Sequence, residues 1–211
     1  MGWDSLYPQL LAAGVSDAHV LEAMASIPRE SFLAPHQYGE AYTDRALPIA
    51  CGQTISQPIV VGLMTQALML TGQEKVLEVG TGSGYQAAIL SRLCRRLYSL
   101  ERHRDLHTTA TARFQDLRLR NITTLLGDGW RGWPEQGPFD RIIVTAAADE
   151  IPQTLTEQLT VGGIMVIPVG EQYQDQQMLR IYRSEQGFHV EELFPVRFVP
   201  MVRGLATGGR Y

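Results

Sequence analysis

The feature that most constrains this chain is a glycine-rich turn at residues 76–85, which joins an apolar stretch to an amphipathic one. The stretch before the turn, Val76–Val79, is β-type, and the stretch that begins at Tyr85 has helical spacing. Glycine allows positive φ and close approach of a ligand to the backbone, and the first turn of a helix presents free N–H groups. A strand, a glycine turn and a helix in this order predict a site for an adenosine-bearing cofactor.

The spacing of the glycines narrows the kind of cofactor. Nicotinamide and flavin proteins carry G-x-G-x-x-G, whereas here the third glycine falls early and Tyr85 stands where it would be. An acidic residue followed by G-x-G-x-G resembles the first motif of Rossmann-like S-adenosylmethionine-dependent methyltransferases. The resemblance implies that the cofactor is S-adenosylmethionine, whose sulfonium is cationic. It also implies cofactor contacts from Glu78, Gly80, Thr81, Gly82, Ser83 and Gly84.

A second acidic residue stands at a position that suits the ribose of such a cofactor. The apolar stretch Leu97–Leu100 ends in Glu101, about twenty residues after the first glycine. An acidic residue at that distance holds ribose hydroxyls in this class of fold. We therefore expect Glu101 to bind the ribose, with Arg102 beside it at the cofactor. The alternative is a surface glutamate that pairs with Arg102 or Arg104.

Short apolar strands alternate with amphipathic helices through the middle of the chain. This alternation predicts an α/β fold of the Rossmann-like methyltransferase kind, with a mostly parallel, doubly wound sheet. The expected strands are Lys75–Val79, Leu97–Glu101, Thr123–Leu126, Arg141–Thr145 and Ile164–Pro168. The expected helices are Tyr85–Leu93, Leu106–Leu119 and Pro152–Gln158. The last expected feature is an antiparallel hairpin at the edge, formed by Gln177–Arg183 and His189–Phe198.

The residues before the first strand predict a helical appendage and a long loop. Helices are expected from about residue 16 to Pro28 and from Pro58 to near Gly72. Between them, residues 29–57 are rich in Pro, Gly and Tyr without a sustained period, which predicts an ordered loop over the core. We expect residues 1–57 to form the N-terminal appendage and a substrate loop, and residues 58–211 to form the core of a single domain.

Residues that follow the third and fourth strands are also candidates, because the ligand crevice of an open α/β sheet lies beyond the strand ends. Asp128 is placed to accept from the adenine amino group, and Gly129 would let the ring approach. The alternative is a turn closed by an Asx hydrogen bond of Asp128 itself. Thr145 is expected at the cofactor, and the three alanines after it leave no stacking platform for a nucleobase substrate. Trp130 and Trp133 either wall the cavity or pack in the core.

Further segments make the resemblance more specific. They are Pro28–Leu33, Ala41–Ile49, Gly52–Pro58, Val76–Tyr85, Gly127–Gly129, Phe139–Ala147, Gln158–Leu159, Gly162–Gly170 and Phe198–Pro200. With them the chain resembles the protein-L-isoaspartate (D-aspartate) O-methyltransferase family. The resemblance implies methyl transfer from S-adenosylmethionine to the free α-carboxylate of L-isoaspartyl residues in damaged peptides and proteins. The resulting ester would then collapse to a succinimide, which allows repair.

The resemblance also implies the substrate side of the site. It places Ile55, Ser56 and Val199 at the substrate, with Ser56 as the catalytic residue that orients the acceptor. A carboxylate with a pKa of ~4 is already ionised at neutral pH, so a fixed hydrogen-bond donor is more useful than a base. The alternative is that Ser56 caps the helix starting at Pro58. Residues 197–203 either form an ordinary edge strand or border the substrate cleft.

Composition limits the remaining possibilities. The net charge of −4 and a pI near 5.7 argue against a nucleic-acid-binding surface. No apolar window is long enough to span a membrane. Cys51 and Cys94 have no paired spacing, and His103 and His107 lack a third metal ligand. We expect a cytoplasmic monomer without a metal. No secretory signal is present, so we expect the mature chain to begin at or near Met1.

Two other functions compete with this interpretation. The runner-up is an S-adenosylmethionine-dependent methyltransferase of the same fold that acts on a small molecule or another protein acceptor. From a different class comes a non-catalytic module that binds an adenosine cofactor. A dinucleotide dehydrogenase is disfavoured by the glycine spacing.

Overall fold

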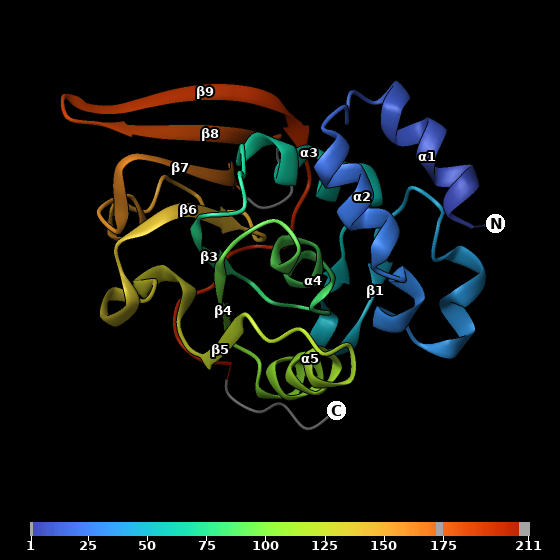
Figure 1. Cartoon of the computed structure of the whole chain (residues 1–211). Coiled ribbons are helices and arrows are strands. Elements are labelled where there is room, and N and C mark those ends of the chain that lie inside the picture. Colours follow the sequence, from blue (N-terminus) through green and yellow to red (C-terminus); the bar gives the residue numbers. More distant parts are fainter. Residues whose placement is uncertain (1, 172–174, 207–211) are drawn as a thin grey trace.

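A mixed sheet forms the centre of the molecule (Figure 1). The computed structural model describes residues 2–171 and 175–206. Within these residues the sheet has seven strands: β3 (Lys75–Val79), β4 (Arg96–Glu101), β5 (Ile122–Leu126), β6 (Phe139–Val144), β7 (Leu159–Val169), β8 (Gln176–Ser184) and β9 (Gly187–Val196). Their order is β5-β4-β3-β6-β7-β8-β9; β3 to β7 run parallel, and β8 and β9 form an antiparallel edge. The predicted sheet is confirmed.

The strand order reverses at β3, and this reversal places a crevice at the carboxyl end of the strand. From β3 the chain moves outward to β4 and β5, and then returns to lay β6 on the other side of β3. In the register, Val79 of β3 pairs with Leu100 of β4 and with Val144 of β6, so the three strands end at the same level. Ligands of open α/β sheets bind at such a reversal.

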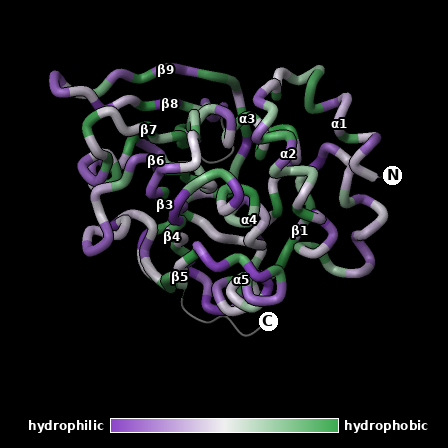
Figure 2. Tube along the Cα trace, viewed as in Figure 1, coloured by the Kyte–Doolittle hydropathy of each residue, from purple (hydrophilic) through white to green (hydrophobic). Residues whose placement is uncertain are grey.

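Among the described residues, five helices lie on one side of the sheet. They are α1 (Trp3–Ala12), α2 (Ala18–Ser26), α3 (Pro58–Ala67), α4 (Tyr85–Ser91) and α5 (Arg104–Asp116). There α1 packs against α3, and α2 packs against α3 and α4. Because side chains alternate along a strand, Val76, Leu97 and Ile143 point to this face and share a buried cluster with helix residues. Much of α5 and the turn between β8 and β9 are hydrophilic (Figure 2).

Short elements cover the opposite face. They are α6 (Gln153–Thr156) and the 3-10 turns η4 (Gly129–Arg131) and η5 (Pro134–Gln136). Trp130 and Leu155 are buried there against Leu77 and Ile142, and Trp133 packs against the same cluster. The two tryptophans therefore pack in the core, which was one of their two predicted roles. The sheet is wound on both sides, but its second layer is thin.

The N-terminal appendage holds one more helix than the sequence predicts. Helix α1 precedes the expected helix and buries Leu6 and Leu10, one helical turn apart, in the core. Pro8 lies inside α1, and a proline within a helical pattern normally argues against a helix. The expected helix, α2, is capped by Asp17, whose side chain accepts hydrogen bonds from two backbone N–H groups of the first turn.

The clearest other differences from the predicted lengths are in three elements, α3, β7 and α6. Helix α3 ends at Ala67, about one turn before the expected end near Gly72. Strand β7 begins at Leu159 and not at Ile164. The prediction starts too late because the glycine pair 162–163 lies inside the strand and weakens the strand pattern in the sequence. The early start of β7 also shortens the expected helix before it to the four residues of α6.

Residues 29–57 form the ordered loop that the sequence predicts. They contain the 3-10 helices η1 (Arg29–Phe32), η2 (Pro35–Glu40) and η3 (Ala50–Gly52), and the short antiparallel strands β1 (Leu47–Pro48) and β2 (Thr54–Ile55). Phe32, Leu47 and Ile55 are buried in the cluster that the helices share. Packing against this cluster fixes the loop and brings its last residues to the crevice at the end of β3.

Candidate active site

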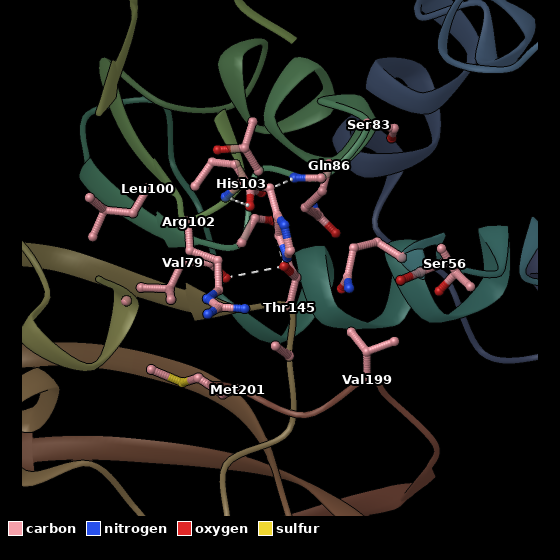
Figure 3. Close-up of a pocket in the computed structure, with 18 of the residues that line it drawn as sticks. Ser56, Val79, Ser83, Gln86, Leu100, Arg102, His103, Thr145, Val199 and Met201 are labelled. Atoms are coloured by element: carbon pink, nitrogen blue, oxygen red, sulfur yellow. Dashed lines mark hydrogen bonds between the residues drawn. The ribbon is translucent and has the colours of Figure 1, made fainter. Parts of the chain in front are cut away.

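A cavity opens where β3, β4 and β6 end (Figure 3). Its wall includes the glycine turn after β3, residues at the ends of β4, β5 and β6, the loop before α3, and the stretch after β9. The lining residues include Gln53–Ser56, Gly80–Ser83, Leu100–His103, Gly129, Thr145, Ala146 and Val199–Val202. Ser56 and Val199 lie at one end of the cavity in Figure 3, and Leu100 and Arg102 lie at the other. The cavity therefore brings predicted cofactor residues and predicted substrate residues together.

The glycine turn is held against the ends of both neighbouring strands. The Gly80 N–H donates to the Leu100 carbonyl at 2.8 Å, and the Thr145 hydroxyl donates to the Gly80 carbonyl at 2.6 Å. Gly80 has a φ of 98°, and a Cβ at this position would lie 2.3 Å from Thr145 Oγ1. Both the backbone conformation and this close approach require glycine.

The other two glycines of the turn have different roles. Gly82, with a φ of 54°, lines the cavity, and a Cβ there would meet nothing closer than a methyl group of Ile49 at 3.9 Å. Gly84, with a φ of 91°, is the N-cap of α4, and a Cβ there would lie 2.8 Å from the Phe114 ring. Gly82 thus leaves backbone open to a ligand, whereas Gly84 lets α5 pack closely and does not line the cavity.

Glu101 is a fixed hydrogen-bond acceptor in the cavity wall. Its side chain is only 5% exposed, and its two oxygens accept from the Gly82 N–H at 2.8 Å and from the His103 N–H at 2.9 Å. These bonds orient the carboxylate and leave further lone pairs for a ligand. The burial of Glu101 excludes the alternative of an exposed glutamate at the surface.

Glu78 lies beneath the glycine turn and does not line the cavity. Its side chain is fully buried; the Ser99 hydroxyl donates to Glu78 Oε2 and lies 2.5 Å from the Thr81 hydroxyl. Burial raises the pKa of Glu78 to about 8, the negative charge of Glu101 adds to this rise, and the hydrogen bond from Ser99 opposes it. Glu78 supports the turn through Ser99, and its direct contact with a cofactor stays a prediction.

Asp128 forms the Asx turn that the sequence offered as its alternative role. Its Oδ1 accepts from the Trp130 N–H at 3.0 Å and caps η4. The neighbouring Gly129 lines the cavity, and a Cβ there would lie 2.5 Å from Val79 Cγ1, so glycine is needed at this position. Asp128 itself does not line the cavity, and its contact with adenine stays a prediction.

Ser56 and Ile55 lie in the wall that the loop before α3 provides. Ile55 is buried, and Ser56 is half-buried, with its main-chain carbonyl accepting from Arg29 Nη2 at 2.8 Å. The N-cap of α3 is Gln57, which makes no side-chain capping bond. The alternative in which Ser56 caps this helix is therefore wrong, and Ser56 lies at the cavity (Figure 3).

The segment 199–206, after β9, supplies a further side of the cavity through its first four residues, Val199–Val202. The Ala147 N–H donates to the Val199 carbonyl at 2.8 Å, and the Met201 N–H donates to the Ala147 carbonyl at 2.7 Å. Trp130 donates from Nε1 to the Met201 carbonyl at 2.9 Å, and the Arg203 guanidinium lies 4.0 Å from the centre of the Trp130 ring. The segment 199–206 is thus fixed to the residues that follow both β5 and β6.

Arg102 ties the same segment to the end of β4. It donates from Nε to the Gly204 carbonyl at 3.0 Å, and its own carbonyl accepts from the Ala206 N–H at 3.1 Å. Arg102 also lines the cavity. Of the segment 197–203, Val199–Val202 line the cavity, and their contact with a substrate stays a prediction.

Several lining residues were not predicted. His103 lines the cavity, and its position two residues after Glu101 was a usable signal. Gln53 and Thr54 lie in the loop segment whose next two residues were chosen as substrate contacts. Val61 and Met64 also line the cavity, but their helical spacing is that of ordinary core residues, so the sequence alone did not distinguish them.

The described residues offer no other chemical centre of the kinds considered from the sequence. Among them, no group of three or more His, Cys, Asp or Glu side chains could hold a metal ion. Cys51 is exposed, Cys94 is buried, and both are free thiols. Across residues 2–171 and 175–206, the helices include none long and apolar enough to cross a bilayer.

Comparison with known proteins decides the family. Residues 3–206 match the family model of protein-L-isoaspartate(D-aspartate) O-methyltransferase (PCMT). The chain belongs to the PCMT family. The protein-L-isoaspartate O-methyltransferase of Paracoccus denitrificans is 59% identical to this PCMT over 192 residues, which are 91% of this chain and 89% of the relative. That of Paramagnetospirillum magneticum is 55% identical over 201 residues, which are 95% of this chain and 94% of the relative.

Solved structures of the family share the fold of this PCMT. One protein-L-isoaspartate O-methyltransferase superposes with a TM-score of 0.83 at 31% identity, over 98% of this chain and 66% of the other, longer chain. A Plasmodium falciparum chain described as a PCMT, in complex with S-adenosyl-L-homocysteine, superposes with a TM-score of 0.83 at 25% identity. That match covers 96% of this chain and 99% of the other. The methyltransferase fold predicted from the glycine turn is confirmed.

Proposed function

We propose that this PCMT transfers a methyl group from S-adenosylmethionine to the free α-carboxylate of L-isoaspartyl residues in damaged peptides and proteins. The methyl ester then collapses to a succinimide, which opens the route to repair. The observation that carries the proposal is a single cavity lined by the glycine turn, by Glu101 and by the loop that bears Ser56. Membership of the PCMT family over residues 3–206 supports the substrate class.

The cavity suits an adenosine cofactor with a cationic sulfonium. Glu101 would accept from the ribose hydroxyls, because its carboxylate is already oriented by two backbone N–H groups. Gly82 and Gly129 leave space where side chains would otherwise stand. Bound S-adenosylmethionine supplies an activated methyl group. The residues proposed to hold it are Gly80, Thr81, Gly82, Ser83, Glu101, Arg102, Gly129 and Thr145, supported by Glu78, Gly84 and Asp128.

Ser56 is proposed to orient the acceptor. A hydroxyl can donate to a carboxylate without neutralising it, and the acceptor carboxylate is already ionised at neutral pH. The chain therefore needs no general base at this position, and its main contribution is to fix the acceptor beside the cofactor turn. Ile55 and Val199 would flank the acceptor, because both line the cavity, and Val199 lies at the same end of it as Ser56 (Figure 3).

We also propose that this PCMT is a cytoplasmic monomer that acts on proteins and peptides rather than on nucleic acid. Free thiols at Cys51 and Cys94 fit a reducing compartment. The net charge of −4 does not favour binding to phosphate backbones, which attract positively charged proteins. Residues 1–57 would supply the substrate loop and its support, and residues 58–211 the methyltransferase core.

Methyl transfer to a pair of peptides that differ only in one residue, isoaspartate or aspartate, tests the proposal. We expect methylation of the isoaspartyl peptide alone. Ser56→Ala should lower kcat by about 10-fold or more while the Kd for S-adenosylhomocysteine changes by less than about twofold. Ser184→Ala, at the exposed last residue of β8, is the matched control and should behave like the unmodified chain.

The other outcomes separate the rival functions. Methylation of neither peptide, together with tight binding of S-adenosylhomocysteine, would favour a cofactor-binding module. Methylation of both peptides, or of small acids only, would favour a different acceptor. An equal loss of cofactor affinity in Ser56→Ala and Glu101→Ala would contradict the division of the cavity into a substrate end and a cofactor end.

A further inference from the structure

Arg29 is a buried cation for which the proposed reaction has so far no use. Its side chain has an exposed fraction of 0%, although an unpaired charge is costly to bury. Nη2 donates to the main-chain carbonyl of Ser56 at 2.8 Å, whereas Nε and Nη1 have no hydrogen-bond partner among the described residues. Burial lowers the pKa of Arg29, and the nearby Tyr85 and Asp44 oppose this effect. The hydrogen bond to the Ser56 carbonyl is therefore the main contact that the buried guanidinium of Arg29 provides.

An aromatic ring lies against the same guanidinium. The Cζ of Arg29 is 4.8 Å from the centre of the Tyr85 ring, a distance at which the ring face attracts a cation. Tyr85 is buried and is the first residue of α4, directly after the glycine turn. Arg29 thus contacts, with one planar group, the backbone of the substrate loop and the helix that the cofactor turn opens.

A second buried contact runs from Tyr85 to the other side of the glycine turn. The Phe32 ring lies edge-on to Tyr85, with 5.4 Å between the ring centres, and the Arg113 guanidinium lies 5.9 Å from the centre of Phe32. Arg113 Nη1 then donates to the main-chain carbonyl of Ser83 at 3.0 Å. The series Arg29–Tyr85–Phe32–Arg113 therefore joins the carbonyl of Ser56 to that of Ser83.

The two serines at the ends of this series both line the cavity, Ser56 from the loop before α3 and Ser83 from the glycine turn. The distance between these two segments sets the distance between acceptor and donor in methyl transfer. Rates of such reactions fall steeply when the reacting atoms are misplaced, by about 100-fold for a displacement of about 1 Å. A rigid buried connection between the two segments would therefore act on turnover.

We propose that Arg29 is a positioning residue for methyl transfer: it holds the main chain of Ser56 at a fixed place relative to the glycine turn, through Tyr85. Arg29 does not line the cavity, so it acts through Ser56 and not on the acceptor itself. This inference rests on the proposed function of Ser56.

A double-mutant cycle between Arg29 and Ser56 tests the inference on the full chain. Arg29→Met removes the charge and the hydrogen bond at similar length, and we expect kcat for the isoaspartyl peptide to fall by about 10- to 100-fold. The KM and the Kd for S-adenosylhomocysteine should change by less than about threefold, because the cofactor end stays in place. In the Ser56→Ala background, Arg29→Met should lower kcat by less than about threefold further.

Two further variants separate positioning from folding. Arg29→Lys keeps a cation that can approach the ring and donate one hydrogen bond, so it should recover part of the kcat that Arg29→Met loses. Arg45→Met, an exposed arginine of the same loop paired with Glu40, is the control and should leave kcat unchanged. The melting temperature and circular dichroism of each variant show whether it is folded.

Several results would overturn the inference. One is a kcat of Arg29→Met within twofold of that of the unmodified chain. Another is a loss of kcat in the double variant equal to the product of the two single losses, because the two residues would then act independently. Failure of both Arg29→Met and Arg29→Lys to fold would assign Arg29 to stability alone. If Ser56→Ala has no effect on its own, the role of Arg29 falls with that of Ser56 while isoaspartyl methylation stands. Absence of isoaspartyl methylation in the unmodified chain refutes the proposed function itself.

Discussion

The buried carboxyl of Glu78 gives the protein a pH dependence whose sign and size follow from its position. Burial raises the pKa of Glu78 from 4.5 to about 8, so between these two values the folded chain holds a proton that the unfolded chain has released. Protonation then favours the folded state, and the free energy of unfolding falls as pH rises towards 8. One proton corresponds to a slope of about 1.4 kcal/mol per pH unit, or up to about 4 kcal/mol between pH 5 and pH 8.

Glu78→Gln removes this titration and keeps the size of the side chain. The amide oxygen can still accept from Ser99, so the glycine turn keeps its support. We expect urea unfolding between pH 5 and pH 8 to give a difference in free energy, unmodified chain minus variant, that decreases by about 1.4 kcal/mol per pH unit. Taking this difference cancels the contributions of groups that titrate alike in both proteins.

The outcome that refutes this reasoning is a difference that does not change with pH. Such a result would mean that Glu78 is ionised in the folded protein and that its neighbours stabilise the charge more than burial penalises it. Glu22→Gln, an exposed glutamate of α2, provides the control, because it should leave the pH dependence unchanged. The same Glu78→Gln protein also tests the cofactor contact predicted from the sequence, since a direct contact would weaken S-adenosylhomocysteine binding at every pH.

Three further predictions concern the cavity wall and the turn at Asp128 beside it. Glu101→Ala should weaken S-adenosylhomocysteine binding in calorimetry by about 10-fold or more, from the loss of charge-assisted hydrogen bonds worth ~1.5–3 kcal/mol; an unchanged Kd would exclude the ribose contact. Gly80→Ala should lower the melting temperature much more than Gly72→Ala, because both have positive φ but only Gly80 places a Cβ against Thr145; equal losses would contradict this. Asp128→Ala should lower the free energy of unfolding by about 1 kcal/mol through the lost cap, and a change in cofactor affinity without that loss would favour the adenine contact.

The residues at the strand ends were the most predictable part of the site. Gly80 and Thr145 each follow a short apolar strand and Glu101 ends one, and the carboxyl ends of parallel strands meet at one edge of the sheet. Their convergence therefore follows from the alternation of strands and helices alone. The substrate loop was different, because its lack of a sustained period gave no geometry, and Ser56 was chosen only through the family resemblance.

The supporting contacts could not be predicted, because they depend on neighbours distant in the sequence. The burial of Glu78 depends on its pairing with Ser99 in the adjacent strand. The segment Pro28–Leu33 carries part of the family resemblance, but the burial of Arg29 and its bond to Ser56 arise from packing of the loop against α4. Helix α1 is not predicted, because Pro8 argues against a helix although Leu6 and Leu10 have helical spacing and are buried in the core.

The segment 199–206, whose first four residues line the cavity, has a consequence for how the protein folds. These residues follow every strand of the sheet in the sequence, yet they complete the cavity by hydrogen bonds to Ala147, Trp130 and Arg102. A nascent polypeptide can therefore assemble its β-scaffold on the ribosome while one side of the pocket is still missing. Binding of the methyl donor would then become possible only after residues 199–206 have docked. A chain truncated just before Val199 should therefore fold but fail to retain its methyl donor.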